Sequence, residues 1–299
     1  MQIKQIATTN VRIPYAAPVG PYIGRRSVGG HGTLGAGGLI VKIETDTGII
    51  GWGEGTGVFE TNPNTILAAH RVANIEGALA AMELAGINKG PMSGIEMALW
   101  DALGKHAELP VYQLFGGQVR DEVDFCACMG LKEPTESAAT AREYIDRWGF
   151  RFLKTKAGDD SDDDLQIAEA IQGEVGNDAV LRPDANNGYS PEEAKSVLRR
   201  MKDLGVRYFE DPCSSEHLDA LVHFRMEIGM GILVNMGVGT PDTVLTLLAN
   251  EGVDIIMPDT PAAGGMIRVK KVAAVAEAYN TPCLMHCSHD LGLKTAAIT

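Results

Sequence analysis

Short apolar stretches alternate with amphipathic stretches along the second half of the chain. The apolar stretches are rich in β-branched residues, which favour strands. The predicted strands span residues 123–129, 151–157, 179–184, 206–211, 231–236, 253–258 and 282–287. Between them, sequences such as Ser190-Pro191-Glu192-Glu193 are typical of helix N-termini. Regular alternation of strands and helices predicts a parallel barrel, because the crossover helices cover strands that are otherwise exposed on one face.

The first part of the chain has a different pattern. Strand-like segments cover residues 1–16 and 38–54, and the second folds back as a hairpin at Asp46-Thr47-Gly48. Apolar residues at helical spacing then predict two helices, at about 64–86 and 93–107. This mixture indicates a separate α+β domain ahead of the barrel.

We therefore expect an α/β protein with an α+β capping domain at residues 1–118 and a modified (β/α) barrel at 119–299. An open doubly wound sheet is the alternative, but no glycine-rich phosphate loop follows the first strand. The sequence stops at Thr299, where a helix after the seventh strand begins. The last barrel strand is accordingly expected to be missing from this sequence.

Polar residues recur at the ends of the predicted strands. The spacing is 28 residues from Lys156 to Asp184, 26 from Asp184 to Glu210 and 25 from Glu210 to Asn235. In a parallel barrel the carboxyl ends of the strands meet at one mouth, where catalytic groups gather. The set expected at this mouth is Lys154, Lys156, Asp184, Glu210, Asn235, Asp259 and His286.

The residue types in this set indicate metal-assisted proton transfer. Asp184, Glu210 and Asn235 offer oxygen ligands, which suit Mg²⁺ rather than Zn²⁺. Lys154 and Lys156 point to the same side of their strand, so each disfavours the other's charge. We expect the pKa of at least one lysine to be lowered toward the range of a base. His286 is a candidate second acid or base, oriented by Asp259.

A glycine-rich loop follows the first strand. Seven of the twenty residues in Pro18–Gly37 are glycine, which makes the backbone permissive. The loop carries Tyr22, Arg25, Arg26 and His31, a set suited to closing over an anionic ligand. A plain flexible surface loop is an equal alternative. The aspartate run at 159–164 is interpreted as a helix start rather than a metal site.

Composition limits the classes of partner. With 26 basic and 39 acidic residues the net charge is −13, which argues against nucleic acid and anionic membranes as partners. An anionic substrate must therefore be attracted by a local metal or lysine cluster. No long apolar run or charged leader is seen, so neither a transmembrane helix nor a secretory signal is expected. Five cysteines without a CxxC pair favour reduced thiols and a cytoplasmic location.

Several motifs together resemble the enolase superfamily, in its mandelate racemase and glucarate dehydratase branch. The resemblance covers essentially the whole chain. The motifs are Ile50-Gly51-Trp52-Gly53-Glu54, Ile95-Glu96-Met97-Ala98-Leu99-Trp100-Asp101, Leu109-Pro110-Val111-Tyr112-Gln113-Leu114-Phe115-Gly116-Gly117, Lys154-Thr155-Lys156, Asp184-Ala185-Asn186, Glu210-Asp211-Pro212 and the 27-residue spacing of Asp259 and His286.

The resemblance implies a Mg²⁺-assisted removal of a proton α to a carboxylate, a chemistry for which this superfamily is a standard example. It implies Lys156 as the base on one face, with Lys154 tuning it or binding the carboxylate. His286, paired with Asp259, would be the acid or base on the other face. His289 is a competing candidate for that role, but the spacing from Asp259 favours His286.

Further likenesses point to the reaction. Asn235 stands where many members carry a carboxylate, and in this it resembles glucarate dehydratases, as does Cys213. His31 falls near a substrate-contacting histidine of those enzymes. The predicted function is therefore dehydration of an acid sugar to a 2-keto-3-deoxy acid. The residues expected to bind this substrate are His31, Tyr22, Arg25 and Asn186.

Two alternatives remain open at this point. One is a racemase, epimerase or cycloisomerase of the same superfamily, which would use the same two bases without elimination. The other is a metal-binding or assembly protein that retains the fold without turnover. The resemblance also leads us to expect a homo-oligomer.

Overall fold

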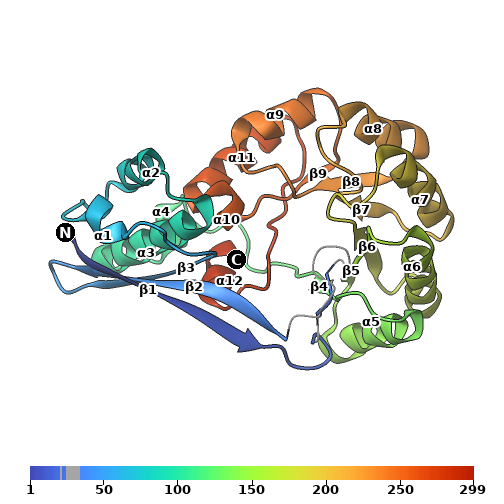
Figure 1. Cartoon of the computed structure of the whole chain (residues 1–299), viewed down its shortest axis with the longest axis horizontal. Coiled ribbons are helices and arrows are strands. Elements are labelled where there is room, and N and C mark those ends of the chain that lie inside the picture. Colours follow the sequence, from blue (N-terminus) through green and yellow to red (C-terminus); the bar gives the residue numbers. More distant parts are fainter. Residues whose placement is uncertain (21, 25–33) are drawn as a thin grey trace.

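The computed structural model describes residues 1–20, 22–24 and 34–299 of the chain. It contains an antiparallel sheet of three strands near the N-terminus and a parallel sheet of six strands further along (Figure 1). The antiparallel strands are β1 (Ile3–Pro14), β2 (Gly35–Thr45) and β3 (Ile50–Gly55), in that spatial order. The hairpin predicted at Asp46-Thr47-Gly48 joins β2 to β3 and is confirmed.

The helix predicted at 64–86 is wrong, because the chain forms two helices there. They are α1 (Pro63–Leu67) and α2 (Ile75–Leu84). Between them Ala69 adopts a φ of 58°, and the amide of Ile3 donates to the carbonyl of His70, so the linker pairs with the start of β1. Asn74 then caps α2 by accepting from the amide of Gly77. Helix α3 (Lys89–Ala107) contains the second predicted helix, and α4 (Val111–Leu114) follows.

Glycines in β3 let α3 lie directly on the sheet. A Cβ atom on Gly51 would come within 2.1 Å of the Ala98 carbonyl oxygen, and one on Gly53 within 2.1 Å of that of Gly94. Any larger residue at these positions would push the helix away. This close packing buries one apolar cluster, which includes Val41, Ile43, Met82, Ile95 and Leu99.

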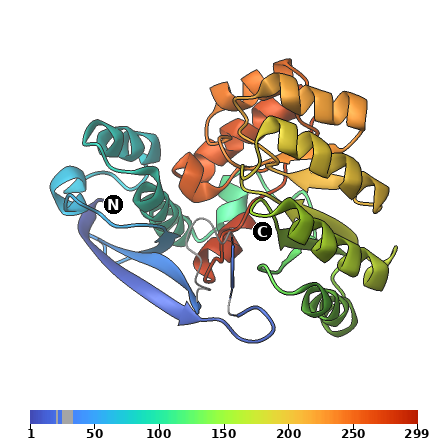
Figure 2. The same ribbon diagram turned by 45° about the vertical axis from the view of Figure 1, so that its right-hand side comes forward.

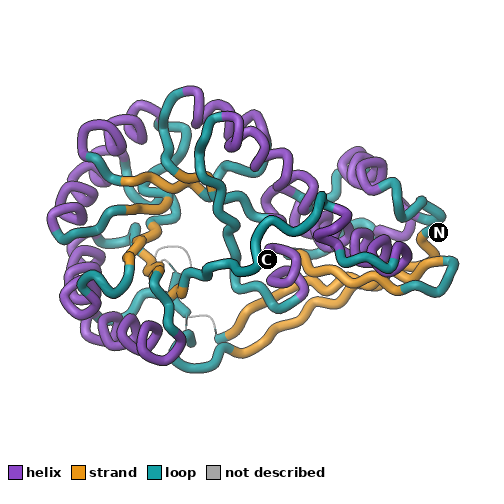
Figure 3. Tube along the Cα trace, turned by 180° about the vertical axis from the view of Figure 1, so that it is seen from behind, coloured by secondary structure: helices purple, strands orange, loops and turns teal. Residues whose placement is uncertain are grey.

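The parallel sheet curves round, with helices on its outer side (Figures 1 and 3). Its strands run in sequence order: β4 (Ala127–Cys128), β5 (Phe152–Lys156), β6 (Val180–Asp184), β7 (Tyr208–Glu210), β8 (Gly231–Val234) and β9 (Ile255–Ile256). The intervening helices are α5 (Pro134–Trp148), α6 (Ser161–Val175), α7 (Pro191–Asp203), α8 (Leu218–His223) with the π-helical turn Phe224–Ile228, and α9 (Pro241–Ala249). After β9 come α10 (Thr260–Ala263), α11 (Met266–Ala278) and α12 (Leu293–Ile298). The curved parallel sheet with outer helices and the N-terminal antiparallel sheet confirm the predicted barrel-type fold with its cap. Among the described residues the sheet runs from β4 to β9 without closing.

The segment predicted as the seventh strand pairs in parallel with β9. The amide of Ile256 donates to the carbonyl of Pro282, Leu284 donates to Ile256, and His286 donates to Pro258. Only the bridge between Ile256 and Cys283 has full ladder geometry. The pairing nevertheless sets His286 beside the end of β9, where Asp259 lies.

Two buried glutamates of the capping domain cap helices of the barrel domain. Glu96 on α3 accepts from the amides of Met266 and Ile267, at 2.9 and 3.0 Å, at the start of α11. Glu54 on β3 does the same for α12, which lies between the two sheets (Figure 2). A carboxylate at a helix N-terminus satisfies unpaired amides and suits the helix dipole. These contacts fix the orientation of the two domains.

The aspartate run at 159–164 starts α6, as predicted. Asp160 is the N-cap and accepts from the amides of Asp162 and Asp163. Asp164, however, is buried and accepts from the Gly158 amide and from the Tyr189 hydroxyl, at 2.8 and 2.5 Å. Burial raises the pKa of Asp164 to about 6, although both hydrogen bonds oppose the shift. The loop that follows β5 is therefore tied down by a titrating carboxyl.

The raised pKa of Asp164 predicts that the contribution of this carboxyl to folding stability falls as the pH rises from about 4 to about 7. The pKa of this carboxyl is above its ordinary value of 3.8 in the folded state, so folding favours the protonated form. That stabilisation is present below pH 4 and disappears as the pH passes 6. The loss amounts to about 3 kcal/mol. Urea unfolding of the wild type and of Asp164→Asn at pH 4.5 and 7 measures it as a difference between the two proteins. The same pH dependence in both would contradict the assignment.

Within the described residues no helix is both long enough and apolar enough to cross a membrane.

Candidate active site

Lys156, Asp184 and Glu210 lie at one level on three neighbouring strands. The register of the parallel ladder pairs Lys156 with Asp184, and Asp184 with Glu210. Both carboxylates have no exposed surface, and Lys154, two residues before Lys156, is 5% exposed. The four side chains expected at the strand ends from their spacing in the sequence therefore lie together in the structure.

The two lysines are held by carboxylates. Lys154 Nζ lies 2.8 Å from Asp184 Oδ2 and 2.7 Å from Glu210 Oε1. Lys156 Nζ lies 2.6 Å from Asp184 Oδ2 and 2.7 Å from Asn186 Oδ1. Burial disfavours the charge of Lys154, but the two carboxylates outweigh it and its pKa is raised. We expected each lysine to lower the pKa of the other, but the pKa of Lys154 is raised and this lysine stays a cation.

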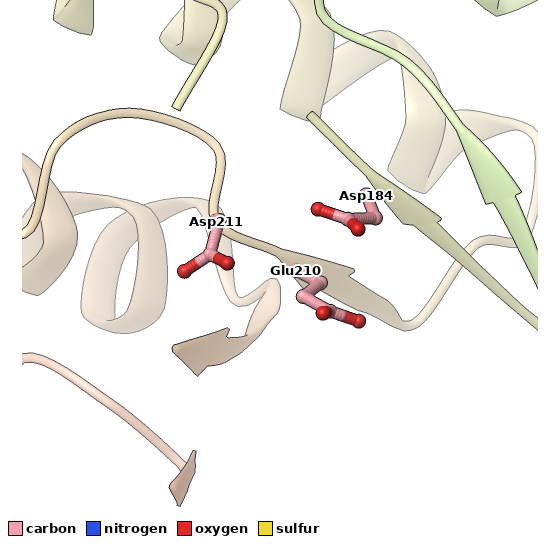
Figure 4. Close-up of side chains that lie close together, drawn as sticks. All are labelled: Asp184, Glu210 and Asp211. Atoms are coloured by element: carbon pink, nitrogen blue, oxygen red, sulfur yellow. The ribbon is translucent and has the colours of Figure 1, made fainter. Parts of the chain in front are cut away.

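Three buried carboxylates lie close enough together to hold a metal ion. Ligand atoms of Asp184, Glu210 and Asp211 lie within 4.8 Å of one another (Figure 4). Asp211 was not among the predicted ligands, because it follows Glu210 directly and should point to the other face of the strand. Its φ of 44° turns the chain just after β7. Burial, with the charges of Asp184 and Glu210, raises the pKa of Asp211 to about 8.

Asn235 lies next to this group at the end of β8. Its amide nitrogen Nδ2 donates to the Met257 carbonyl at 2.8 Å, which leaves Oδ1 as the side-chain atom able to bind a cation. Its backbone amide donates to Asp211 Oδ1 at 3.0 Å, so Asp211 also orients the Asn235 backbone. Asn235 thus remains a proposed ligand, with Asp211 adjoining it.

A buried carboxylate oxygen supports the fit to a hard cation. Among the described residues, Glu210 Oε2 accepts no hydrogen bond. Arg182 Nε lies 3.0 Å from it, outside hydrogen-bond geometry. Leaving a buried carboxylate oxygen without a donor is unfavourable, and a bound cation would satisfy it. Oxygen donors of this kind fit Mg²⁺, with Asp184, Glu210 and Asn235 as the residues that would hold it. Arg182 was not predicted, although its place two residues before Asp184 on the same face of β6 is a usable signal.

An imidazole–carboxylate pair lies at the other end of the strand array. Asp259 Oδ2 is 2.8 Å from His286 Nδ1 and accepts from the Ser288 hydroxyl at 2.8 Å. Burial raises the pKa of Asp259, but the hydrogen bond from His286 and the charge of Lys294 outweigh it and the pKa is lowered. An ionised carboxylate only accepts, so Nδ1 carries a proton in this contact, and Nε2 takes no part in it.

His289 has a different environment. Its ring lies 4.3 Å from that of Tyr22 and 5.3 Å from that of Tyr15, measured between ring centroids. Burial and the charges of Lys156 and Lys154 lower the pKa of His289 to about 4, so it is neutral at pH 7. Tyr22 is buried, with its hydroxyl 3.4 Å from Cys128 Sγ. The contact with Asp259 therefore distinguishes His286 from His289.

The remaining predicted substrate residues are divided between the site and the loop. Asn186, with a φ of 46°, accepts from Lys156 and donates its amide to Asp184 Oδ1 at 2.9 Å. It therefore orients the candidate base. Arg25 and His31 lie outside the described residues, as does Arg26.

The chain matches two family models that cover most of its length. Residues 31–116 match the mandelate racemase/muconate lactonizing enzyme N-terminal domain, and residues 136–299 match the enolase C-terminal domain-like model. The L-Ala-D/L-Glu epimerase of Bacillus subtilis is 30% identical over 99% of this chain and 84% of the epimerase. The D-xylonate dehydratase of Haloferax volcanii is 30% identical over 87% of this chain and 71% of the dehydratase.

Solved structures agree with this relationship. A substrate-liganded complex of the Bacillus subtilis epimerase has a TM-score of 0.87 at 29% identity, covering 99% of this chain and 86% of that one. The dipeptide epimerase from Enterococcus faecalis, complexed with Mg and the dipeptide L-Leu-L-Tyr, has a TM-score of 0.88 at 25% identity, covering 100% and 86%. The chain therefore belongs to the mandelate racemase/muconate lactonizing enzyme branch of the enolase superfamily.

Proposed function

We propose that this protein is a Mg²⁺-dependent dehydratase of acid sugars, which converts a hydroxy-carboxylate into a 2-keto-3-deoxy acid. The observation that carries the proposal is the pair of His286 and Asp259 at the other end of the strand array from Lys156. A base and a separate acid are what elimination of water requires, since the α-proton and the β-hydroxyl leave to different groups.

The proposed steps balance as loss of one water molecule. Lys156, as the neutral amine, takes the proton from the carbon next to the carboxylate. His286 gives a proton to the departing β-hydroxyl, the C–O bond breaks, and an enol remains. The enol tautomerises by taking up one solvent proton at the former β-carbon, which gives the keto acid. Lys154, charged and buried beside Asp184 and Glu210, adds positive potential where negative charge develops.

Mg²⁺ bound by Asp184, Glu210 and Asn235 would act as a Lewis acid toward the substrate carboxylate and make the α-proton more acidic. An amide as the third ligand leaves the site one charge more positive than a carboxylate would, which favours a dianionic intermediate. This charge argument supports removal of the α-proton, the first step that dehydration and epimerisation share.

Racemisation or epimerisation is a second candidate, and the similarity to the Bacillus subtilis epimerase favours it. The same two groups would then remove a proton from one face and return one to the other, with no bond to oxygen broken. The related D-xylonate dehydratase is also 30% identical to this chain, and it supports the first candidate equally. The two functions differ in their products.

A screen of an acid-sugar library tests the proposal. Each sugar acid is incubated with the protein and Mg²⁺, and keto acids are detected by their semicarbazone absorbance. The proposal predicts a keto acid from at least one sugar acid. Formation of only the C2 epimer, with no keto acid from any sugar, would contradict it and support the second candidate. A protein that retains the fold but catalyses no reaction would give neither product and would exchange no α-proton in D₂O.

Removal of divalent metal is expected to abolish turnover and to lower stability together. A metal ion that binds only the folded state stabilises it, and saturation at about 100 times Kd contributes about 2.7 kcal/mol. Thermal unfolding with EDTA, and after Mg²⁺ is added back, measures this without reference to activity. Glu210→Gln is the matched variant, and its Tm should respond less to Mg²⁺. Full turnover after exhaustive chelation would contradict the metal site.

A further inference from the structure

A buried lysine forms an ion pair with Asp259 through the carboxylate oxygen that His286 does not contact. Lys294 on α12 is 1% exposed, and its Nζ lies 2.6 Å from Asp290 Oδ1 and 3.2 Å from Asp259 Oδ1. A buried ammonium group is costly unless carboxylates surround it. Because Asp259 turns its other oxygen to His286, the three residues form a chain that runs from Lys294 through Asp259 to the imidazole. The steps proposed above make no use of Lys294.

The capping domain holds this lysine in place. Glu54 on β3 is 3% exposed and accepts from the amides of Leu291 at 2.7 Å, Gly292 at 3.1 Å and Lys294 at 3.0 Å. These are the amides at the N-terminus of α12, the helix that carries Lys294. Glu54 and Lys294 are 240 residues apart in the chain, so the contact forms only when the two domains are packed together.

We propose that Lys294 is a positioning residue that holds Asp259 as a carboxylate aimed at His286 Nδ1, and that Glu54 makes this arrangement depend on the docked capping domain. Its effect on turnover rests on the proposed function of His286. Its effect on the imidazole does not depend on which reaction the enzyme catalyses.

Charge and tautomer explain what Lys294 does. The groups that face Asp259 are His286 and Ser288 on one oxygen and Lys294 on the other, while Asp290 shares the lysine. Without the ammonium group, two buried carboxylates are left close together, which favours protonation of one of them. A protonated Asp259 would donate to Nδ1 instead of accepting from it. The proton would then sit on Nε2 of a neutral ring, and the imidazole would lose the carboxylate that stabilises its positive charge in the acid role.

The experiment is ¹⁵N NMR of histidine-labelled protein, with His286→Asn to assign the signal. Wild type is expected to show the Nδ1–H form, with a low-field proton from the bond to Asp259. Lys294→Met should shift this signal toward the Nε2–H form, and Lys294→Arg, which keeps the charge, should restore it at least in part. We expect kcat of Lys294→Met to fall about 10- to 100-fold with little change in KM, the range known for residues that orient metal-ligating histidines.

Two further variants keep the test informative. Lys271→Met is the matched control, because it removes an ion pair with Glu76 in which both side chains are half exposed, and it should change neither signal nor kcat. Asp290→Asn combined with Lys294→Met removes an anion together with the cation, so it protects against misfolding. It should show the change at His286 in weaker form, because Asp259 loses its ammonium partner but also the repulsion of Asp290. An unchanged His286 signal in folded Lys294→Met, or in the folded double variant, would overturn the proposal.

Glu54→Gln tests the contribution of the capping domain. The glutamine has a single acceptor oxygen for the three amides that donate to Glu54. The change at His286 is therefore expected in weaker form. No change would exclude the capping domain from the arrangement. If the imidazole responds as expected but no acid sugar is dehydrated, the positioning role holds and the proposed reaction is wrong, so the two failures are distinguishable.

Discussion

Replacement of Lys156 by alanine is expected to lower the rate of α-proton removal by about 10²- to 10⁴-fold. Lys156 is the residue whose amine is hydrogen bonded to both Asp184 and Asn186, so it is fixed at the end of β5. Without it no other described amine has this placement, since Lys154 is committed to two carboxylates. The measurement is the loss of the substrate α-proton signal by NMR in D₂O, together with keto-acid formation.

Lys156→Arg is the control for charge. The guanidinium keeps a cation beside Asp184 but stays protonated at any working pH, so it cannot serve as a base. We expect it to be as inactive as Lys156→Ala while its Tm still rises with Mg²⁺. Exchange of the α-proton at the wild-type rate in Lys156→Ala would show that another group is the base.

The second large effect is expected at His286. Substitution with asparagine should lower dehydration by about 10²- to 10⁴-fold, because the leaving hydroxyl loses its acid. Exchange of the substrate α-proton should persist, since Lys156 and the metal ligands are unchanged. The two rates are read from one NMR time course in D₂O, as loss of the α-proton signal and as appearance of keto acid. A variant that lost both rates equally would contradict the division of roles.

His289→Asn is the matched control for this assignment. The His289 ring packs against Tyr22 and, being neutral at pH 7, is not charged by a partner carboxylate. It should retain most of the elimination that His286→Asn loses. The reverse order of the two variants would make His289 the acid.

Much of the fold and site follows from periodicity. The spacing of polar residues at strand ends was sufficient to bring Lys156, Asp184 and Glu210 to one level, because parallel ladders keep equivalent positions side by side. The Asp259–His286 contact likewise follows from two neighbouring segments that run in the same direction. These features depend on local pattern, which a single sequence contains.

Other features depend on tertiary contacts or unusual backbone angles. Asp211 joins the carboxylate group through a positive φ that alternation along a strand does not predict. The break between α1 and α2 depends on a hydrogen bond to β1, and the role of Lys294 depends on Glu54 at the far end of the chain. A pattern within a short stretch of sequence does not identify partners that lie far apart along the chain.

Deuterium incorporation into the product tests the central claim most directly. The protein is incubated with Mg²⁺ and a turned-over acid sugar in D₂O, and the products are analysed by NMR and mass spectrometry. Wild type is expected to make a 2-keto-3-deoxy acid with one solvent deuterium at C3, and Lys156→Ala is expected to make none. Recovery of the C2 epimer with deuterium at C2, and no keto acid, would contradict dehydration and establish an epimerase.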